Sequence, residues 1–241
     1  MIVLYTDFGW RGPYVGQMHL VLAAAAPGVT VVDLMHDAPA FAPAAAGHLL
    51  AALVPRLPLG AVCVAVIDPG VGTGRDPVVL EADGRWFVGP ANGLFNTLSA
   101  RSAAARWWRI DAGTADSSAT FHGRDLFAPV GATLARGEPV PGYPIGPPHG
   151  PEAAADRPEV VYIDAYGNAM TGLRAPSGRG WRLDVGDRAV SPGRTFADVG
   201  PGEATWLVNS VGLVEIAVNQ GSAASVLGLG VGSPVAWAAA H

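Results

Sequence analysis

The sequence predicts an α/β fold with two domains: an N-terminal α/β domain with a mostly parallel sheet, and a smaller C-terminal β-barrel or sandwich domain. Over the first 136 residues, short apolar segments typical of buried strands alternate with helical segments, which is the pattern of parallel strands joined by crossover helices. From residue 159 onward only short β-rich segments occur, separated by Gly, Asn, Ser and Asp.

The N-terminal elements are placed by their apolar content and by the residues that end them. Pro27 and Gly28 end the first helix, and Asp83 and Gly84 are the expected turn of a hairpin. The expected strands are residues 1–5, 29–34, 61–67, 78–81 and 86–88, and the expected helices are residues 14–26, 42–53 and 126–136.

A segment rich in proline and glycine separates the two predicted domains. Residues 137–158 contain seven prolines and four glycines, a density that no packed helix or central strand tolerates. The C-terminal strands are expected at residues 160–164, 181–185, 205–208 and 213–218. We therefore divide the chain into an α/β domain (1–136), a linker (137–158) and a β-rich domain (159–241).

The composition favours a packed protein that acts on a small molecule. Half of the residues are apolar and 15% are charged, which suits a large core, and the net charge of −5 argues against nucleic-acid binding. No apolar stretch approaches the roughly 20 residues that span a bilayer, and no signal-peptide pattern is seen. Cys63 cannot form an internal disulfide, so we expect a cytoplasmic protein with no membrane partner.

The chain contains 15 arginines and no lysine. Without lysine the chain can form no Schiff base with a carbonyl substrate or a pyridoxal cofactor. It also lacks the lysine with which a P-loop contacts ATP phosphates.

Two carboxylates follow predicted strands, at the edge of the sheet where a ligand is expected. Asp7 could accept two hydrogen bonds from a ribose diol, or it could be a turn or cap residue. Asp68 opens a glycine-dense loop that ends in Arg75 and could approach a ligand closely. The alternative is an Asp-Pro-Gly turn with a surface arginine, and the glycine spacing does not match the dinucleotide-binding fingerprint.

His122 lies between a small polar loop and the last predicted helix, flanked by Gly and charged residues, which permits either a catalytic or a structural role. His36 and His48 have no partners at metal-ligand spacing, so we expect no metal site.

Two further segments contain asparagines in predicted turns. Asn92, followed by Gly93, is assigned to a tight turn. Asp164 and Asn168 bracket another turn, although the Asn168 amide could also read an adenine edge with its paired donor and acceptor.

Six segments together resemble the S-adenosyl-L-methionine (SAM) hydroxide adenosyltransferase family, the hydrolytic relatives of enzymes that fluorinate or chlorinate the adenosyl group of SAM. Their order and spacing extend over nearly the whole chain. The segments are TDFG with YVG (6–16), VIDPGVGTGR (66–75), GPANGL (89–94), TFHGRD (120–125), YIDAYGN (162–168) and EIAVNQGSA (215–223).

This resemblance implies a role for each candidate residue. Three residues match the family's water-activating triad, namely Asp68, Arg75 and His122. Seven match substrate-binding positions: Asp7 for the ribose hydroxyls, Phe41, Thr120 and Phe121 for packing of the nucleoside, Asn168 for adenine, and Asp164 and Ser210 for the methionine end.

The resemblance also implies the reaction and the assembly. It implies hydrolysis of SAM to adenosine and methionine without a cofactor or metal. The family members are trimers in which an N-terminal domain and a neighbour's C-terminal domain share each site, so we expect a homotrimer or a dimer of trimers.

Three positions distinguish this chain from the halogenating branch. Asp68 stands where fluorinating relatives have tyrosine, which favours water over halide. Gly123 stands where fluorinating relatives have a halide-contacting serine, although chlorinating relatives share the glycine. Gly12 stands where that branch has an Asp that binds the methionine amine. The alternatives to hydrolysis are a SAM-dependent chlorinase and a non-catalytic sensor that binds the adenosyl group.

Overall fold

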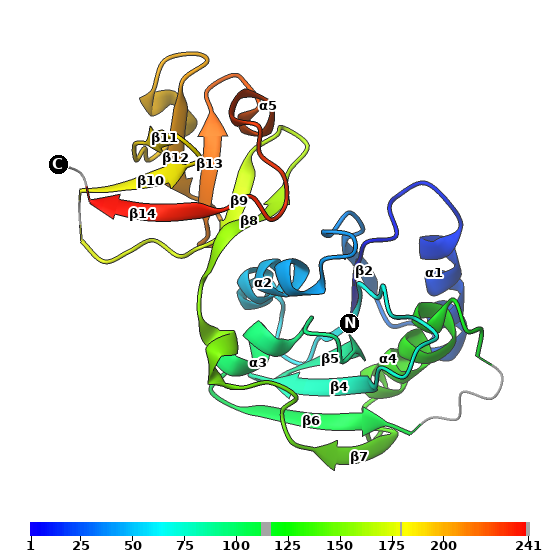
Figure 1. Cartoon of the computed structure of the whole chain (residues 1–241). Helices are drawn as coiled ribbons and strands as arrows, with labels where there is room; N and C mark the ends of the chain where they lie inside the picture. Colours follow the sequence, from blue (N-terminus) through cyan, green and yellow to red (C-terminus); the bar gives the residue numbers. More distant parts are fainter. Residues whose placement is uncertain (112–116, 179, 240–241) are drawn as a thin grey trace. The chain divides into compact units, whose positions relative to one another are not determined.

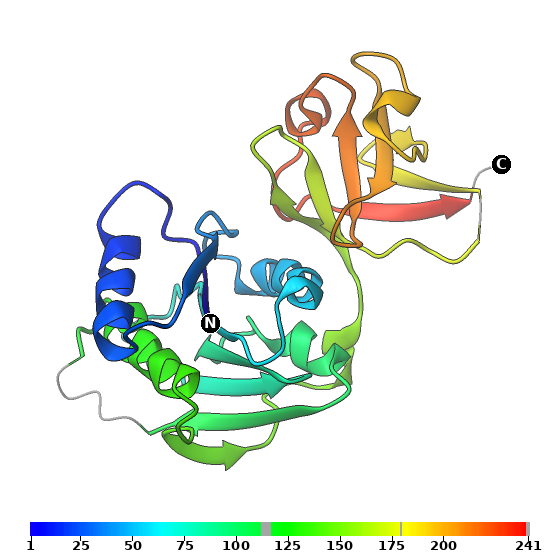
Figure 2. The same cartoon turned by 180° about the vertical axis from the view of Figure 1, so that it is seen from behind.

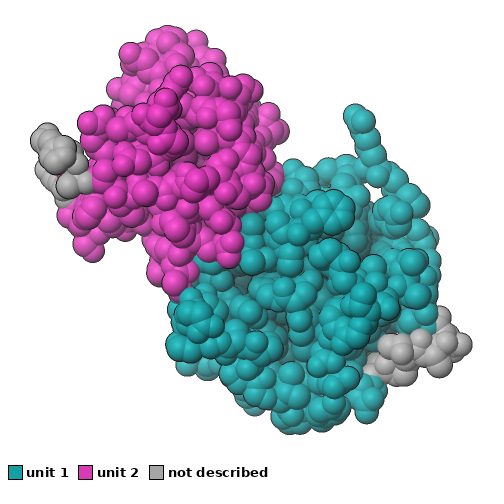
Figure 3. All heavy atoms as spheres, in the orientation of Figure 1, with its two compact units in different colours: residues 1–154 teal, residues 155–241 magenta. Residues whose placement is uncertain are grey.

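A computed structural model describes residues 1–111, 117–178 and 180–239 (Figure 1). The chain divides into two compact units, Met1–Ala154 and Ala155–His241, which are coloured separately in Figure 3. The boundary lies within the Pro- and Gly-rich segment 137–158.

The first unit is built on a seven-stranded mixed sheet with the order β2-β1-β3-β5-β4-β6-β7. Strands β2, β1, β3 and β5 pair in parallel, whereas the pairs β5/β4, β4/β6 and β6/β7 are antiparallel. The strands are β1 (Ile2–Thr6), β2 (Val31–Met35), β3 (Val62–Val66), β4 (Pro77–Ala82), β5 (Arg85–Pro90), β6 (Ala105–Ile110) and β7 (Gly142–Ile145). The α/β prediction is confirmed, but the sheet is mixed rather than mostly parallel, because the hairpin at Asp83 and Gly84 changes the pairing from parallel to antiparallel.

Helices cover both faces of this sheet (Figures 1 and 2). Along β1, Val3 and Tyr5 belong to the core on the α2 side, whereas Ile2 and Leu4 belong to the core on the α1 side, as the alternation of a strand requires. One face carries α1 (Tyr14–Ala25), the π-helical turn η2 (Gly123–Phe127) and α4 (Ala128–Ala135), and the other carries α2 (Pro43–Leu53), η1 (Val54–Arg56) and α3 (Asn96–Arg101). None of the helices in the described residues is long and apolar enough to cross a membrane.

The Pro- and Gly-rich segment includes β7 and the short helix η3 (Pro151–Ala154). Strand β7 contains Pro144 and lies at the edge of the sheet. An edge strand tolerates proline because one side of its backbone has no partner strand.

The second unit consists of two antiparallel sheets around one core, which confirms the predicted β-rich C-terminal region. Val160, Leu183 and Ile216 come from both sheets and share that core. One sheet has the order β11-β10-β14, with β10 (Trp181–Val185), β11 (Arg188–Val190) and β14 (Val235–Ala239). The other has the order β12-β13-β9-β8, with β8 (Arg157–Ile163), β9 (Ala169–Gly172), β12 (Ala204–Val208) and β13 (Val214–Val218). Two short helices, η4 (Phe196–Asp198) and α5 (Ala223–Leu227), complete the unit.

The packing of α2 leads to a prediction about two helical glycines. A Cβ on Gly47 would lie 2.4 Å from the Leu94 carbonyl oxygen, whereas a Cβ on Gly16 in α1 would meet no atom within 4 Å. We expect Gly16→Ala to stabilise the fold by about 0.5–1 kcal/mol, since alanine favours helix over glycine. Gly47→Ala should instead lower the melting temperature measured by calorimetry, because α2 must move away from the chain at Leu94. Equal effects of the two substitutions would contradict this packing.

Candidate active site

Asp68, Arg75 and His122 form one hydrogen-bonded cluster in the first unit. The Arg75 Nε donates to both Asp68 carboxylate oxygens at 3.0 Å, and its Nη2 also contacts Asp68 Oδ2. The same Nη2 lies 2.8 Å from His122 Nδ1. The side chains of Arg75 and Asp68 are only 9% and 4% exposed, so the ion pair is largely shielded from bulk water. The structure therefore brings together the three residues that the sequence assigned to the triad.

The partners of His122 determine the position of its proton. A guanidinium can only donate, so the Nδ1 atom that faces Arg75 must accept, and the proton of the neutral ring lies on Nε2. Burial lowers the pKa of His122 below its ordinary 6.5, and the positive charge of Arg75 lowers it further. His122 is thus a neutral imidazole at neutral pH.

The Asp68 loop is held by its glycines and by its neighbours. Gly72 has a φ of +77°, and a Cβ there would lie 2.4 Å from the carbonyl oxygen of Ala119, so only glycine lets this loop approach the segment that leads to His122. Asn92 donates from Nδ2 to the Ile67 carbonyl at 2.9 Å, directly before Asp68. The sequence assigned Asn92 only to a turn, and its anchoring bond could not have been recognised from residue spacing.

A pocket of about 100 Å³ opens beside this cluster. Asp68 and His122 line it together with Asp7, whereas Arg75 lies behind them with its guanidinium over the Phe127 ring, 5.2 Å from the centroid. Six of the predicted residues therefore share one pocket: Asp7, Phe41, Asp68, Thr120, Phe121 and His122.

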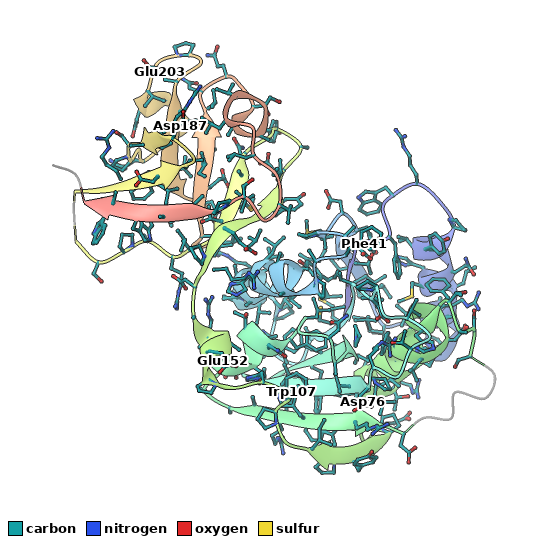
Figure 4. All side chains as sticks on the ribbon, in the orientation of Figure 1. Phe41, Asp76, Trp107, Glu152, Asp187 and Glu203 are labelled. Atoms are coloured by element: carbon teal, nitrogen blue, oxygen red, sulfur yellow. The ribbon has the colours of Figure 1, made fainter. Side chains whose placement is uncertain are left out.

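Asp7 and Phe41 form one rim of this pocket. Burial raises the pKa of Asp7 above its ordinary value, a shift opposed by hydrogen bonds from the backbone of Asp7 and Phe41 and reinforced by the charge of Asp68. Phe41, labelled in Figure 4, lies on the loop between β2 and α2. Its φ of +59° is unusual for a residue with a side chain, and the residue is 83% exposed. A bulky residue held in this conformation beside a pocket is typical of a binding site.

An aromatic cluster that includes two lining residues, Phe8 and Phe121, supports the wall of this pocket. The rings of Phe8, Tyr14 and Phe121 pack with centroids 5.4 to 5.9 Å apart. A Cβ on Gly123 would lie 3.1 Å from Phe8 and 3.2 Å from Phe121, so this wall has little room for a larger residue at position 123. Sequence analysis missed the contribution of Phe8 and Tyr14, which lie within the TDFG and YVG segment.

The second unit has its own pocket of about 930 Å³, lined by the three remaining candidates, Asp164, Asn168 and Ser210. The Asp164 carboxylate accepts hydrogen bonds at 2.9 Å from the backbone N–H groups of Tyr166 and Asn168 and from the Asn168 amide. It therefore organises the turn that presents Asn168, as the turn interpretation of the sequence expected.

The pocket of the second unit includes residues that the sequence did not single out. Tyr166 and Phe196 provide exposed aromatic surface, and Arg194 adds a cation. The Glu215 carboxyl is buried, which raises its pKa, and it accepts a hydrogen bond from Asn209 at 3.0 Å. Of these residues, Tyr166 lies within the YIDAYGN motif and Glu215 begins the EIAVNQGSA motif, whereas Phe196 and Arg194 lie outside the quoted motifs.

Gly167 joins two of the sequence motifs. It has a φ of +84°, and a Cβ there would lie 2.0 Å from the Ser222 hydroxyl oxygen. The backbone N–H of Ala224 also donates to the Gly167 carbonyl at 2.9 Å. The motifs YIDAYGN and EIAVNQGSA are therefore parts of one structure.

The two other histidines considered from the sequence, His36 and His48, line neither of these pockets. His36 bonds to Thr6 and Asp33, and His48 is buried in α2. Among residues 1–111, 117–178 and 180–239, no group of three or more His, Cys, Asp or Glu side chains is arranged to hold a metal ion.

The contact at Gly72 leads to a second prediction. Gly72→Ala should separate the Asp68 loop from the segment at Ala119 and so displace Arg75 from His122. Gly74→Ala is the matched control, because a Cβ at Gly74 would meet no atom within 4 Å. The displacement can be followed by the shift of the His122 ring resonances in NMR spectra, which should change in Gly72→Ala and stay constant in Gly74→Ala. Unchanged resonances in both variants would refute the proposed contact.

The chain is similar to known families and proteins over most of its length. Residues 2–143 match the model of the SAM hydroxide adenosyltransferase N-terminal domain, and residues 158–236 match that of the C-terminal domain. A relative from Thermus thermophilus called (R)-S-adenosyl-L-methionine hydrolase is 43% identical, covering 97% of this chain and 98% of its own. A relative of the same name from Salinispora tropica is 40% identical, covering 93% of this chain and 92% of its own.

Solved structures agree with these matches. An uncharacterised conserved protein from Thermotoga maritima superposes with a TM-score of 0.86 at 29% identity, covering 98% of this chain and 99% of its own. A conserved hypothetical protein from Thermus thermophilus superposes with a TM-score of 0.79 at 39% identity, with the same coverage of each chain. With both family domains matched in order, the chain belongs to the SAM hydroxide adenosyltransferase family.

Proposed function

We propose that this chain hydrolyses SAM, with water displacing L-methionine from the 5′ carbon to give adenosine. The observation that carries the proposal is the cluster of Asp68, Arg75 and His122 beside a pocket that also holds Asp7. The relatives called (R)-S-adenosyl-L-methionine hydrolase support it, because they match this chain over more than nine-tenths of its length. Their name also supports the R configuration at sulfur as the preferred substrate here.

The reaction requires mainly that water be placed in line with the carbon–sulfur bond. A sulfonium is already a good leaving group, so positioning of the nucleophile supplies much of the rate enhancement without a metal or cofactor. Asp68 accepts the proton of the attacking water, and His122 orients that water. Arg75, which lies behind both residues, aligns their side chains, and its positive charge stabilises the developing hydroxide character. Methionine leaves in the same step.

The charges of the pocket suit a cationic substrate and disfavour a halide. Asp7 and Asp68 are both carboxylates that line it, and Asp68 is paired with a guanidinium. The pocket lining itself contains no Lys or Arg among the described residues. Ionised Asp7 therefore adds a negative charge that attracts a sulfonium and repels an anion. The charges of the pocket therefore favour hydrolysis over the chlorinase alternative. The narrow wall at Gly123 leaves little room for the serine that contacts halide in fluorinating relatives, but chlorinating relatives share this glycine, so position 123 does not separate hydrolysis from chlorination.

The remaining predicted residues take the substrate-binding roles that the family resemblance implies. In the first unit, Asp7 holds the ribose hydroxyls, and Phe41, Thr120 and Phe121 pack against the nucleoside. In the second, Asn168 reads adenine, and Asp164 and Ser210 hold the methionine end. We further propose a cytoplasmic homotrimer or dimer of trimers.

Incubation of the purified protein with SAM tests the function. Adenosine and methionine should appear in equal amounts by chromatography, and the R epimer should disappear first from a mixture of epimers. In ¹⁸O-labelled water the label should enter the 5′ hydroxyl of adenosine. Tight binding of adenosine without any turnover would instead indicate a sensor.

Asp68→Ala should lower kcat by about 100-fold or more, as expected for loss of a general base. Asp76→Ala is the matched control, because Asp76 is half-exposed and pairs at the surface with Arg109, 3.0 Å away. Full turnover by Asp68→Ala would remove Asp68 from the mechanism.

The state of His122 leads to a prediction about pH. Because burial and Arg75 lower its pKa, the neutral ring persists below pH 6.5 and is lost only as the pH falls through the lowered value. The plot of kcat/KM against pH should therefore decline on the acid side with a midpoint below 6.5. In His122→Asn, which can still accept from Arg75 but has no ring to titrate, this acid limb should be lost. An acid limb centred above 6.5 in the wild type would contradict this assignment.

A further inference from the structure

A second hydrogen-bonded network lies beneath the segment that carries Asp7. Thr6 Oγ1 is 2.7 Å from His36 Nδ1, and His36 Nε2 is 2.9 Å from Asp33 Oδ1. His19 Nε2 contacts the same Asp33 oxygen at 2.8 Å. Thr6 and His36 are fully buried, whereas His19 and Asp33 reach the surface. Neither family motifs nor the proposed mechanism gives this network a function.

The donors and acceptors of this network have one consistent direction. The Asp33 carboxylate can only accept, so His36 carries a proton on Nε2. The other ring nitrogen, Nδ1, then accepts from the Thr6 hydroxyl, and Thr6 Oγ1 in turn accepts from the backbone N–H of Phe8 at 3.3 Å. This arrangement gives a partner to each buried side-chain polar atom of Thr6 and His36, and it runs from the Phe8 backbone to the carboxylate of Asp33.

The combination of a hydroxyl, an imidazole and a carboxylate resembles a nucleophilic triad, but its burial excludes that role. Neither Thr6 nor His36 has any exposed surface, and neither lines the pocket of the first unit or that of the second. A substrate therefore cannot reach the Thr6 hydroxyl, which is occupied by the Phe8 N–H. The network therefore holds a part of the protein in place and does not react with a substrate.

Several contacts of His36 hold the segment on either side of Asp7. Its side chain binds Thr6, directly before Asp7, and its carbonyl oxygen accepts from the Gly9 N–H at 2.6 Å. Its ring also meets the Trp10 ring edge-on, with centroids 4.7 Å apart. Asp7 is thus fixed from both sides by one histidine that lies on a different part of the chain.

We propose that Thr6 and His36 are positioning residues that aim the Asp7 carboxylate at the ribose hydroxyls. This inference rests on the role of Asp7 in the proposed function. Loss of the buried hydrogen bonds would let the TDFG segment shift, and the carboxylate would then lose its alignment with the two hydroxyls. The rest of the nucleoside would keep its contacts with the aromatic wall.

Binding of two nucleosides separates positioning from a general loss of structure. Dissociation constants for adenosine and for 2′,3′-dideoxyadenosine, which lacks both hydroxyls, are measured by calorimetry. The wild type should prefer adenosine. Thr6→Val, which keeps the shape and removes the hydroxyl, should reduce that preference by about tenfold while leaving the affinity for dideoxyadenosine unchanged. Thr6→Ser, which keeps the hydroxyl, should keep the preference for adenosine. Asp7→Asn should reduce this preference, as Thr6→Val does.

Two histidine variants test whether the effect on the preference for adenosine passes through His36. His36→Gln and His19→Gln each alter one of the two bonds to Asp33 Oδ1, but of these two histidines it is His36 that also contacts Thr6. His36→Gln should lose the preference for adenosine, and His19→Gln should keep it.

The outcomes distinguish this inference from the proposed function. Equal weakening of both nucleosides in Thr6→Val would indicate a structural role only, and an unchanged preference would overturn the inference. SAM turnover by the wild type is measured in parallel. An inactive wild type would refute the proposed function. The affinities for the two nucleosides would still show whether Thr6 and His36 position Asp7.

Discussion

The buried guanidinium of Arg75 is the interaction on which the site depends. A charge removed from water is costly unless it is paired, and Arg75 meets this requirement by binding Asp68 through two nitrogens while one of them also faces His122. The planar donor set of arginine makes both contacts possible at once, which a lysine ammonium could not do with the same geometry. Its position over Phe127 then links the cluster to the π-helical turn that precedes α4.

Two carboxylates in the same pocket have different environments, and this difference separates their functions. The positive charge of Arg75 balances the negative charge of the Asp68 carboxylate, and its hydrogen bonds orient that carboxylate, which suits a group that acts on water. Asp7 is held by backbone N–H groups, has a raised pKa and lines the pocket. Environment rather than residue type assigns the roles, as in other enzymes with paired carboxylates.

The sequence predicts those parts of the fold and the site whose signals are local. The buried parallel strands and the hairpin at Asp83 were recognisable because apolar runs and turn residues lie close together in the chain. Strands β6, β7, β9 and β11 were not, because they are short or contain charged residues or proline. Strand β14, with the apolar sequence VAWAA, was missed as well. Asp68 and Arg75 share one loop, but His122 joins them only through tertiary folding, so its inclusion came from family resemblance. The anchor at Asn92 and the network at His36 depend on side-chain directions that spacing does not encode.

The backbone at Phe41 has a consequence for ligand affinity. A non-glycine residue in the left-handed region is less stable by about 1–3 kcal/mol, yet here the residue is held there before any nucleoside arrives. Its N–H already bonds to the Asp7 carboxylate. The backbone at Phe41 is thus ordered when the protein folds and not when the ligand binds. Binding of a nucleoside therefore loses no further conformational entropy at this position.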